Sequence, residues 1–286
     1  MLVLERLRDL RGVLAGVQAT VGFVPTMGAL HAGHASLMKV ARQECGFVVV
    51  SIFVNPTQFA PGEDLDSYPR TREADIELCR EAGVDLVWFP YAQELYPEGA
   101  ETWVQMEGLG RRFEGESRPS HFRGVATVVT KLFNAVRPDK AYFGQKDLQQ
   151  LHLIRRMVAD LLIPVEVVAV PTAREDSGLA RSSRNEYLST GDREKAAAIY
   201  RGLQAVRRAY ERGEVTSADL RESFQRELSH WQGAELERFD LYDPLLSRAY
   251  GPEEQVGGGY CAVAVRVGKV RLIDNIKLEV RTALCC

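Results

Sequence analysis

Short apolar runs alternate with longer segments of helical periodicity over the first 171 residues of this 286-residue chain. Short runs rich in β-branched side chains are typical of buried strands, whereas apolar residues three and four apart indicate amphipathic helices. The predicted strands are Val21–Pro25, Phe47–Val54, Asp85–Pro90, Lys140–Gly144 and Val165–Pro171. The predicted helices are Ala35–Cys45, Arg72–Ala82, Val125–Val136 and Gln145–Asp160. This alternation predicts an α/β domain in which helices cover both faces of a doubly wound parallel sheet.

The pattern changes after Pro171. Residues 172–189 are polar and have no apolar periodicity. Beyond them the predicted helices are Asp192–Arg212 and Ser217–Trp231, and the predicted strands are Phe239–Tyr242, Tyr260–Val267 and Val270–Ile273, with a glycine loop at 257–259. We therefore predict two domains: residues 1–172 hold the parallel sheet, and residues 173–286 form a smaller C-terminal α+β domain joined by a hinge.

Composition narrows the class of protein. A net charge of −3, with 26% charged and 45% hydrophobic residues, gives no sign of a polyanion-binding surface, so no nucleic-acid partner is expected. The N-terminus places charges among its leucines, and the longest aliphatic run is too short to span a bilayer, so neither a secretion signal nor a membrane anchor is expected. Five cysteines without a CxxC pair favour reduced thiols and a cytoplasmic location. The adjacent Cys285 and Cys286 are interpreted as a frayed tail rather than a metal or redox site.

The most informative segment is Val24–His34, which reads VPTMGALHAGH. It follows a predicted strand and opens a predicted helix, so His31 and His34 should project from one turn at a helix N-terminus. Backbone N–H groups and the helix dipole attract anions there, and Gly28 and Gly33 allow close approach. The segment predicts a phosphate site, although a metal half-site or a satisfied helix cap would use the same pattern.

Two further polar clusters support a nucleotide site. Gly144–Asp147 also begins where a strand ends, and ligands of such sheets lie outside the carboxyl ends of the strands. Its Lys146 ammonium suits a phosphate and its Asp147 carboxylate suits a ribose, but a plain helix start with a solvated lysine is the alternative. Arg181–Asn185 places two hydroxyls and two guanidiniums in the inter-domain segment, where they suit β- and γ-phosphates or form an inert solvated loop.

Several longer motifs make the chain resemble the pantothenate synthetase (pantoate–β-alanine ligase) family over essentially its whole length. They are VPTMGALHAGH at 24–34, SIFVNPTQF at 51–59, DLDSYPR at 64–70, RPSHFRGVATVV at 118–129, FGQKDLQQL at 143–151, SSRNEYLS at 182–189 and RLIDNI at 271–276. The family belongs to the nucleotidyltransferases with an HxGH signature and a KMSKS-like loop. The resemblance implies a Rossmann-like domain with a C-terminal lid. It also implies that ATP and pantoate form pantoyl adenylate, from which β-alanine displaces AMP.

The resemblance also implies roles for individual residues. The residues expected at the nucleotide and its phosphates are Pro25, Thr26, Met27, His31, Gly33, His34, Gly144 and Lys146, with Asp147 on the ribose and Ser182, Ser183 and Arg184 closing over the triphosphate. Gln58 and Gln150 are expected to hold pantoate, with Met27 and Phe59 along its apolar side and Asn55, Tyr68 and Arg118 around it. The family further implies Mg²⁺ with ATP and a homodimer formed through the larger domain. Lys146, His34 and Mg²⁺ should dominate adenylation, because an ionised carboxylate needs positioning rather than a strong base.

Some features depart from the family pattern or stay open. Arg181 stands where methionine is expected in many relatives and Gln145 where glutamate is common, so Arg181 either changes the packing of its loop or adds a phosphate contact. The acidic stretch 63–66 is interpreted as a solvated loop rather than a Mg²⁺ site, and no residue announces itself as the base for the β-alanine amine. The rival functions are a nucleotidylyltransferase that stops at an adenylated product and a nucleotide-binding regulator without catalysis.

Overall fold

The structure is a computed structural model that describes residues 1–60, 62–63, 65–214 and 216–280. The chain divides into two compact units, Met1–Pro171 and Thr172–Cys286. Each unit has a hydrophobic core of its own. The interpretation of Cys285 and Cys286 falls outside the described residues, whereas Cys45, Cys79 and Cys261 are buried free thiols.

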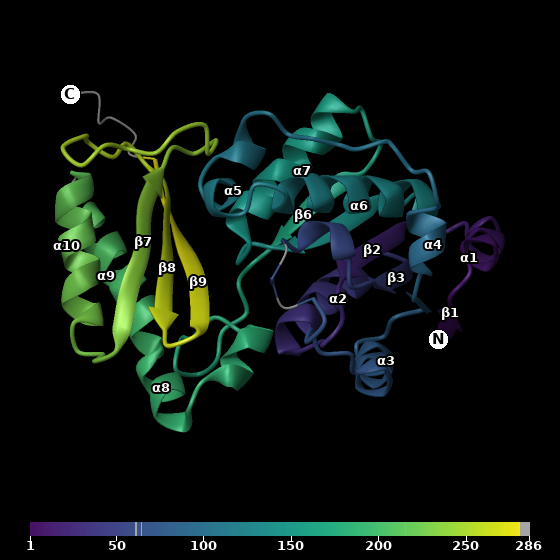
Figure 1. Cartoon of the computed structure of the whole chain (residues 1–286), viewed down its shortest axis with the longest axis horizontal. Coiled ribbons are helices and arrows are strands. Elements are labelled where there is room, and N and C mark those ends of the chain that lie inside the picture. The colour runs from purple at the N-terminus through teal and green to yellow at the C-terminus, as the bar shows by residue number, and fades with distance from the viewer. Residues whose placement is uncertain (61, 64, 215, 281–286) are drawn as a thin grey trace. The chain divides into compact units, whose positions relative to one another are not determined.

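A six-stranded parallel sheet forms the centre of the first unit (Figure 1). Its strands are β1 (Leu2–Leu4), β2 (Val21–Thr26), β3 (Phe47–Ile52), β4 (Leu86–Trp88), β5 (Lys140–Gly144) and β6 (Glu166–Val170), in the order β1-β4-β3-β2-β5-β6. The five predicted strands are confirmed. The edge strand β1, which pairs with β4, was not predicted because three residues are too few to show a periodic pattern.

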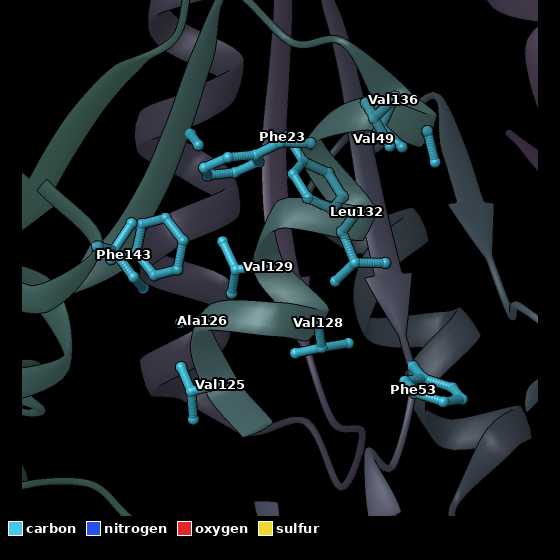
Figure 2. Close-up of a cluster of buried hydrophobic side chains, with 14 of the residues drawn as sticks. Phe23, Val49, Phe53, Val125, Ala126, Val128, Val129, Leu132, Val136 and Phe143 are labelled. Carbon is cyan, nitrogen blue, oxygen red and sulfur yellow. The ribbon is translucent and has the colours of Figure 1, made fainter. Parts of the chain in front are cut away.

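Helices cover both faces of this sheet. They are α1 (Leu7–Leu14), α2 (Ala32–Glu44), α3 (Arg72–Glu81), α4 (Ala92–Leu95), α5 (Glu114–Ser117), α6 (His121–Val136) and α7 (Leu148–Asp160). Successive residues of β2 face opposite sides, so that Phe23 packs in the core with α1, α6 and α7, whereas Val24 packs in the core with α2 and α3. Figure 2 shows the apolar face of α6 against Phe23 and Val49. This three-layer arrangement confirms the doubly wound α/β prediction.

Two helix starts differ from the sequence-based prediction. The helix predicted from Gln145 begins at Leu148, so residues 145–147 form the turn that follows β5. In contrast, α6 begins at His121, four positions before the predicted Val125. The apolar periodicity that locates a helix is weakest at its ends, where polar side chains predominate.

The second unit combines an antiparallel sheet with α-helices (Figure 1). Its strands β7 (Ala234–Tyr242), β8 (Gly259–Val267) and β9 (Val270–Leu278) pair in sequence order, and its helices are α8 (Thr190–Lys195), α9 (Ala197–Arg212) and α10 (Ser217–Leu228). This confirms the α+β prediction, although the single helix predicted over Asp192–Arg212 is interrupted at Ala196. In the described part of the chain, every helix is too short or too polar to cross a bilayer.

Close packing of α6 on the segment after β3 predicts a sensitive glycine. A Cβ on Gly124 would lie 2.4 Å from the Thr57 carbonyl oxygen, a backbone atom that cannot rotate away. We expect Gly124→Ala to lower the free energy of unfolding by about 1–3 kcal/mol, the usual cost of overpacking. Gly12→Ala is the control, because a Cβ there meets nothing within 4 Å and alanine favours the helix. Chemical denaturation that gave both variants equal stability would contradict this account.

Candidate active site

The predicted polar motifs follow β2, β3 and β5, which are neighbours in the sheet. After β2 the chain adds β3 and β4 on one side and then β5 and β6 on the other, so the strand order reverses between β2 and β5. The register of β2 with β5 covers Gly22 and Phe23 and stops before Pro25, which has no N–H for a ladder hydrogen bond. Ligands of doubly wound sheets bind at such a switch point, outside the carboxyl ends of the strands.

The two histidines cap helix α2 reciprocally. His31 is the N-cap, with an extended backbone, and its Nδ1 accepts a hydrogen bond from the Gly33 N–H at 3.0 Å. The Nδ1 of His34 accepts the backbone N–H of His31 at 3.2 Å, and the two ring centroids lie 4.2 Å apart. Because each Nδ1 acts as an acceptor, a neutral ring carries its proton on Nε2. The cap interpretation is thus confirmed, and it orients Nε2 of both rings as a donor.

His34 is uncharged near neutral pH. Burial is the main cause that lowers its pKa to about 3; the charges of His31 and Lys146 lower it further, while Asp147 opposes them. These influences also show that the turn after β5 lies beside the histidine turn. His34 therefore supplies a hydrogen-bond donor rather than a positive charge.

We expect the His34 ring to stay neutral, with its proton on Nε2, when the pH is lowered from about 8 to about 5. A histidine whose pKa is about 3 gains almost no charge over this range. The measurement is ¹⁵N NMR of the imidazole nitrogens against pH, with His34→Gln to assign the signal. A protonation midpoint between about pH 6 and 7 would contradict the expectation.

Lys146 and Asp147 occupy the turn that links β5 to α7. The Lys146 Nζ lies 3.7 Å from Asp147 Oδ1, with the lysine side chain 18% exposed and the aspartate 50%. Asp147 is the N-cap of α7 without a side-chain capping bond, so its carboxylate is not committed to the helix. The sequence-predicted phosphate and ribose groups are therefore next to one another and near His34.

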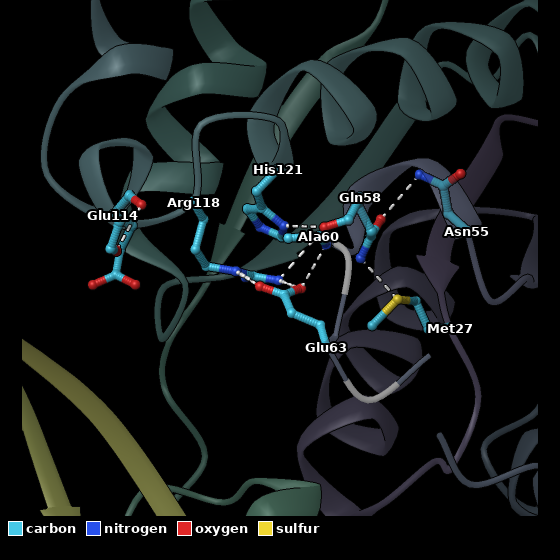
Figure 3. Close-up of polar contacts among 9 residues, drawn as sticks. Met27, Asn55, Gln58, Ala60, Glu63, Glu114, Arg118 and His121 are labelled. Carbon is cyan, nitrogen blue, oxygen red and sulfur yellow. Dashed lines mark hydrogen bonds and ion pairs between the residues drawn. The ribbon is translucent and has the colours of Figure 1, made fainter. Parts of the chain in front are cut away.

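Gln58 lies at the end of a short 3₁₀ turn, Pro56–Gln58, that follows β3 (Figure 3). Its Oε1 accepts a hydrogen bond from the Asn55 side chain at 3.2 Å, and its Nε2 donates to the Met27 sulfur at 2.8 Å. Asn55 also donates to the Gly124 carbonyl and accepts from the Tyr96 hydroxyl. Asn55 is 1% exposed, so this network orients Gln58 beside Met27.

An ion pair and a histidine flank the same turn (Figure 3). Arg118 Nε and Nη2 donate to the two carboxylate oxygens of Glu63 at 2.8 and 2.7 Å. The guanidinium holds the pKa of the Glu63 carboxyl below its usual range. His121 Nδ1 lies 3.0 Å from the Gln58 carbonyl oxygen, and burial lowers the pKa of His121. Glu63 is thus paired rather than solvated, while Asp64 of the same acidic stretch lies outside the described residues.

Sequence reasoning assigned no role to His121 or Asp75. His121 lies inside the motif at 118–129 and is the first residue of α6, so its place in that motif is the signal that was present. Asp75 is a buried carboxylate on α3 that accepts the backbone N–H groups of Ala29 and Leu30. Asp75 lies three and four positions before Leu78 and Cys79, on the apolar side of α3, and this spacing is the signal that could have separated it from the exposed Glu73 and Glu77.

The remaining predicted residues of the first unit lie on the same loops. The Thr26 hydroxyl donates to the Ser51 carbonyl at 2.8 Å, which ties β2 to β3 at their carboxyl ends. The Phe59 and Tyr68 rings meet edge to face at 6.0 Å. Gln150 is half-buried in the first turn of α7. Its neighbour Gln149 is buried and donates to the Leu109 and Arg112 carbonyls, so it serves the fold.

The serine and arginine cluster belongs to the second unit. Ser182 is the N-cap of a 3₁₀ turn, Ser183–Tyr187, and its Oγ accepts the Arg184 N–H at 3.3 Å. Arg184 is exposed, whereas Asn185 is buried and donates to the Ala180 carbonyl. Arg181 Nε donates to the Arg174 carbonyl at 3.3 Å, so this unusual residue takes part in the packing of its loop.

Comparisons with known proteins agree on one family. The family model described as pantoate-beta-alanine ligase matches residues 2–277. The chain is 50% identical over 258 residues to pantothenate synthetase of Herpetosiphon aurantiacus, covering 90% of this chain and 93% of that protein. For the Aquifex aeolicus pantothenate synthetase the identity is 47% over 285 residues, with 97% and 99% covered.

Solved structures give the same result. A crystal structure of pantothenate synthetase from Thermus thermophilus superposes with a TM-score of 0.90 at 47% identity and covers 97% of this chain and 99% of that one. The pantoate-beta-alanine ligase of Francisella tularensis, a complex with beta-gamma ATP and β-alanine, has a TM-score of 0.79 at 34% identity, with 97% of each chain covered. The chain belongs to the pantoate–β-alanine ligase family.

Proposed function

We propose that the chain condenses pantoate with β-alanine, using ATP, through a pantoyl-adenylate intermediate. The observation that carries this proposal is the histidine cap at the switch point, with Lys146 and Asp147 on one side and Gln58 on the other. Family membership supports the ligase activity. The ATP and β-alanine bound by the Francisella relative support the choice of substrates.

In the first step, a carboxylate oxygen of pantoate attacks the α-phosphorus of ATP, and the bond to the bridging oxygen breaks to release pyrophosphate. We assign the Lys146 ammonium to the phosphates as a positive charge, the Nε2–H of His34 as a neutral donor, and the Nε2–H of His31 as a second donor. Preorganised donors of this kind stabilise the charge that develops on the phosphate oxygens. Pro25, Thr26, Gly33 and Gly144 would lie along the nucleotide, with Asp147 at the ribose hydroxyls.

Gln58 is proposed to bind pantoate by exchanging a weak contact for a strong one. The Met27 sulfur that receives its amide hydrogen is a poor acceptor, so a carboxylate or hydroxyl oxygen would replace it favourably. Gln150, Phe59 and Tyr68 would complete the pantoate site. Arg118 uses its Nε and Nη2 edge for Glu63, which leaves the Nη1 end as the part that would meet a substrate.

In the second step, the β-alanine nitrogen attacks the acyl carbon and the bond to the AMP oxygen breaks. The amine loses its protons to solvent or to a base that we do not assign. Ser182, Ser183 and Arg184 are proposed to act on the triphosphate as the KMSKS-like loop of a C-terminal lid. Their place in a polar loop capped by Ser182 supports this role.

Mg²⁺ is proposed to arrive with ATP. In the residues that the structure describes, no cluster of three or more His, Cys, Asp or Glu side chains is placed to hold a metal ion. Mg²⁺ commonly keeps several waters and binds substrate phosphates with few protein ligands, which fits this donor set. We also propose a cytoplasmic homodimer that forms through the larger domain; light scattering that gave a monomer mass at working concentration would contradict the dimer.

Pyrophosphate exchange tests the proposed reaction directly. Purified protein with Mg²⁺ and ATP is expected to incorporate labelled pyrophosphate into ATP when pantoate is present and β-alanine is absent. Net AMP formation should then require both pantoate and β-alanine. Turnover with a phosphorylated acceptor and no amine would instead support the nucleotidylyltransferase, and absence of exchange in protein that binds ATP would overturn the proposal.

A further inference from the structure

The turn between β2 and α2 has an unfavourable backbone conformation. Gly28 has a φ of 93° and the next residue, Ala29, has a φ of 49°. Glycine adopts positive φ without penalty, but a side chain such as that of alanine makes the left-handed region costly. This conformation leads directly into the cap that His31 forms, so the position of both imidazoles depends on something that holds the turn.

The buried side chain of Asp75 holds this turn from helix α3. Its Oδ2 accepts the Ala29 N–H at 3.1 Å and its Oδ1 accepts the Leu30 N–H at 2.8 Å. The Thr71 hydroxyl also donates to Oδ1, at 3.0 Å. Asp75 is 2% exposed, and three donors compensate for the burial of its carboxylate.

The space around the turn leaves little freedom for rearrangement. A Cβ added to Gly28 would lie 3.1 Å from Asp75 Oδ2 and 3.1 Å from the Ile52 side chain. The carboxylate therefore packs directly against the glycine as well as binding the two amides that follow it. Because Gly28 is packed between Asp75 and Ile52, one conformation of the turn is much more favourable than slightly shifted conformations.

We propose that Asp75 is a positioning residue for the adenylation step. Through the Ala29 and Leu30 amides it sets the backbone that enters α2, so that the His31 and His34 rings present their Nε2 donors together. Asp75 itself contacts neither substrate in this account. The inference rests on the proposed function of the two histidines.

The chemistry of the contact explains why a carboxylate is needed. Consecutive N–H groups are received by two different oxygens, and an ionised carboxylate has two acceptors and no donor. An asparagine of nearly the same shape keeps one acceptor and turns an NH₂ group toward the other amide. Asp75→Asn therefore removes one hydrogen bond and places two donors face to face, with little change in volume.

Full-length Asp75→Asn is the test. We expect kcat for pantoate-dependent pyrophosphate exchange to fall about 10–100-fold, with a smaller change in KM for ATP. The reason is that the misplaced histidine donors act mainly in the transition state. The ¹⁵N spectrum of His34 should lose the single Nε2–H form of the parent protein. An unchanged kcat at saturating ATP would overturn the proposal.

Asp85→Asn is the matched control. Asp85 also accepts a backbone amide, that of Val48 at 2.7 Å, and it pairs with Arg42, but Val48 lies near the start of β3 rather than at its carboxyl end. It should lower stability and leave kcat near the parent value. Loss of kcat in both variants in proportion to stability would assign Asp75 to the fold alone.

A double variant keeps the test decisive if Asp75→Asn folds poorly. Ala29→Gly relieves the positive φ, so Ala29→Gly with Asp75→Asn should recover stability while kcat stays low. Recovery of kcat together with stability would overturn the positioning role. Exchange by the parent protein in the same assay separates this outcome from failure of the proposed function, which would abolish exchange in every variant.

Discussion

Lys146→Ala is expected to lower the rate of pantoate-dependent pyrophosphate exchange by about 10²–10³-fold, the usual cost of removing one preorganised group. The reason is that Lys146 and His34 contribute different interactions to the phosphate site. Because the pKa of His34 is lowered to about 3, His34 donates a hydrogen bond without a charge, and the ammonium of Lys146 supplies the positive charge. Its side chain is only 18% exposed, so water screens that charge little.

The matched control for this variant is a lysine at the other end of β5. Lys140 begins β5 and pairs with Glu44 at 2.8 Å, whereas Lys146 follows the end of that strand. We expect Lys140→Ala to keep the exchange rate near that of the parent protein. Exchange and ATP binding should be measured for both variants; near-parent exchange by Lys146→Ala, or an equal loss in the two, would show that Lys146 does not act on the phosphates.

The sequence predicted the layers of both units because buried strands carry uninterrupted apolar runs. Val48, Val49 and Val50 are all buried in β3, with helices on both sides. The prediction was less complete for β9, which was expected to end at Ile273 and continues to Leu278. Asp274 interrupts its apolar pattern, yet Asp274 is buried because two nitrogens of Arg174 bind it at 2.6 and 3.0 Å. A partner 100 residues away is invisible to local periodicity.

The residues of the candidate site could be predicted where they belong to contiguous sequence motifs. The segment 24–34 and the turn 144–147 were predicted to lie at the ends of strands, and they do. The structure also brings His34, Lys146 and Asp147 together. What the motifs left open depends on three-dimensional contacts. The ring nitrogen that each histidine uses for the cap is one example. The long-range bonds from Asp75 to the turn before His31 are another.

Comparison of His34→Gln with His34→Ala separates the structural role of this histidine from its catalytic role. The structural role is local: His34 Nδ1 accepts the His31 N–H and so completes the cap of α2. Glutamine is a common residue at the third position of a capping box, where its side-chain oxygen accepts the same N–H. Alanine has no acceptor. The cap should therefore survive in His34→Gln and be lost in His34→Ala.

The other role is donation from Nε2 of the imidazole ring. Alanine has no donor, and a glutamine amide carries its NH₂ group on a differently shaped side chain, which does not reproduce the ring donor. We expect both to lose about 10²–10³-fold in pyrophosphate exchange, while only His34→Ala loses about 0.5–2 kcal/mol in the free energy of unfolding. Exchange kinetics and chemical denaturation of the two proteins provide the measurement. Parent-like exchange by His34→Gln, with activity and stability lost together in His34→Ala, would reduce His34 to a helix cap. A common loss of exchange with different stabilities means that the imidazole acts on the reacting phosphate, and that its cap serves to aim it.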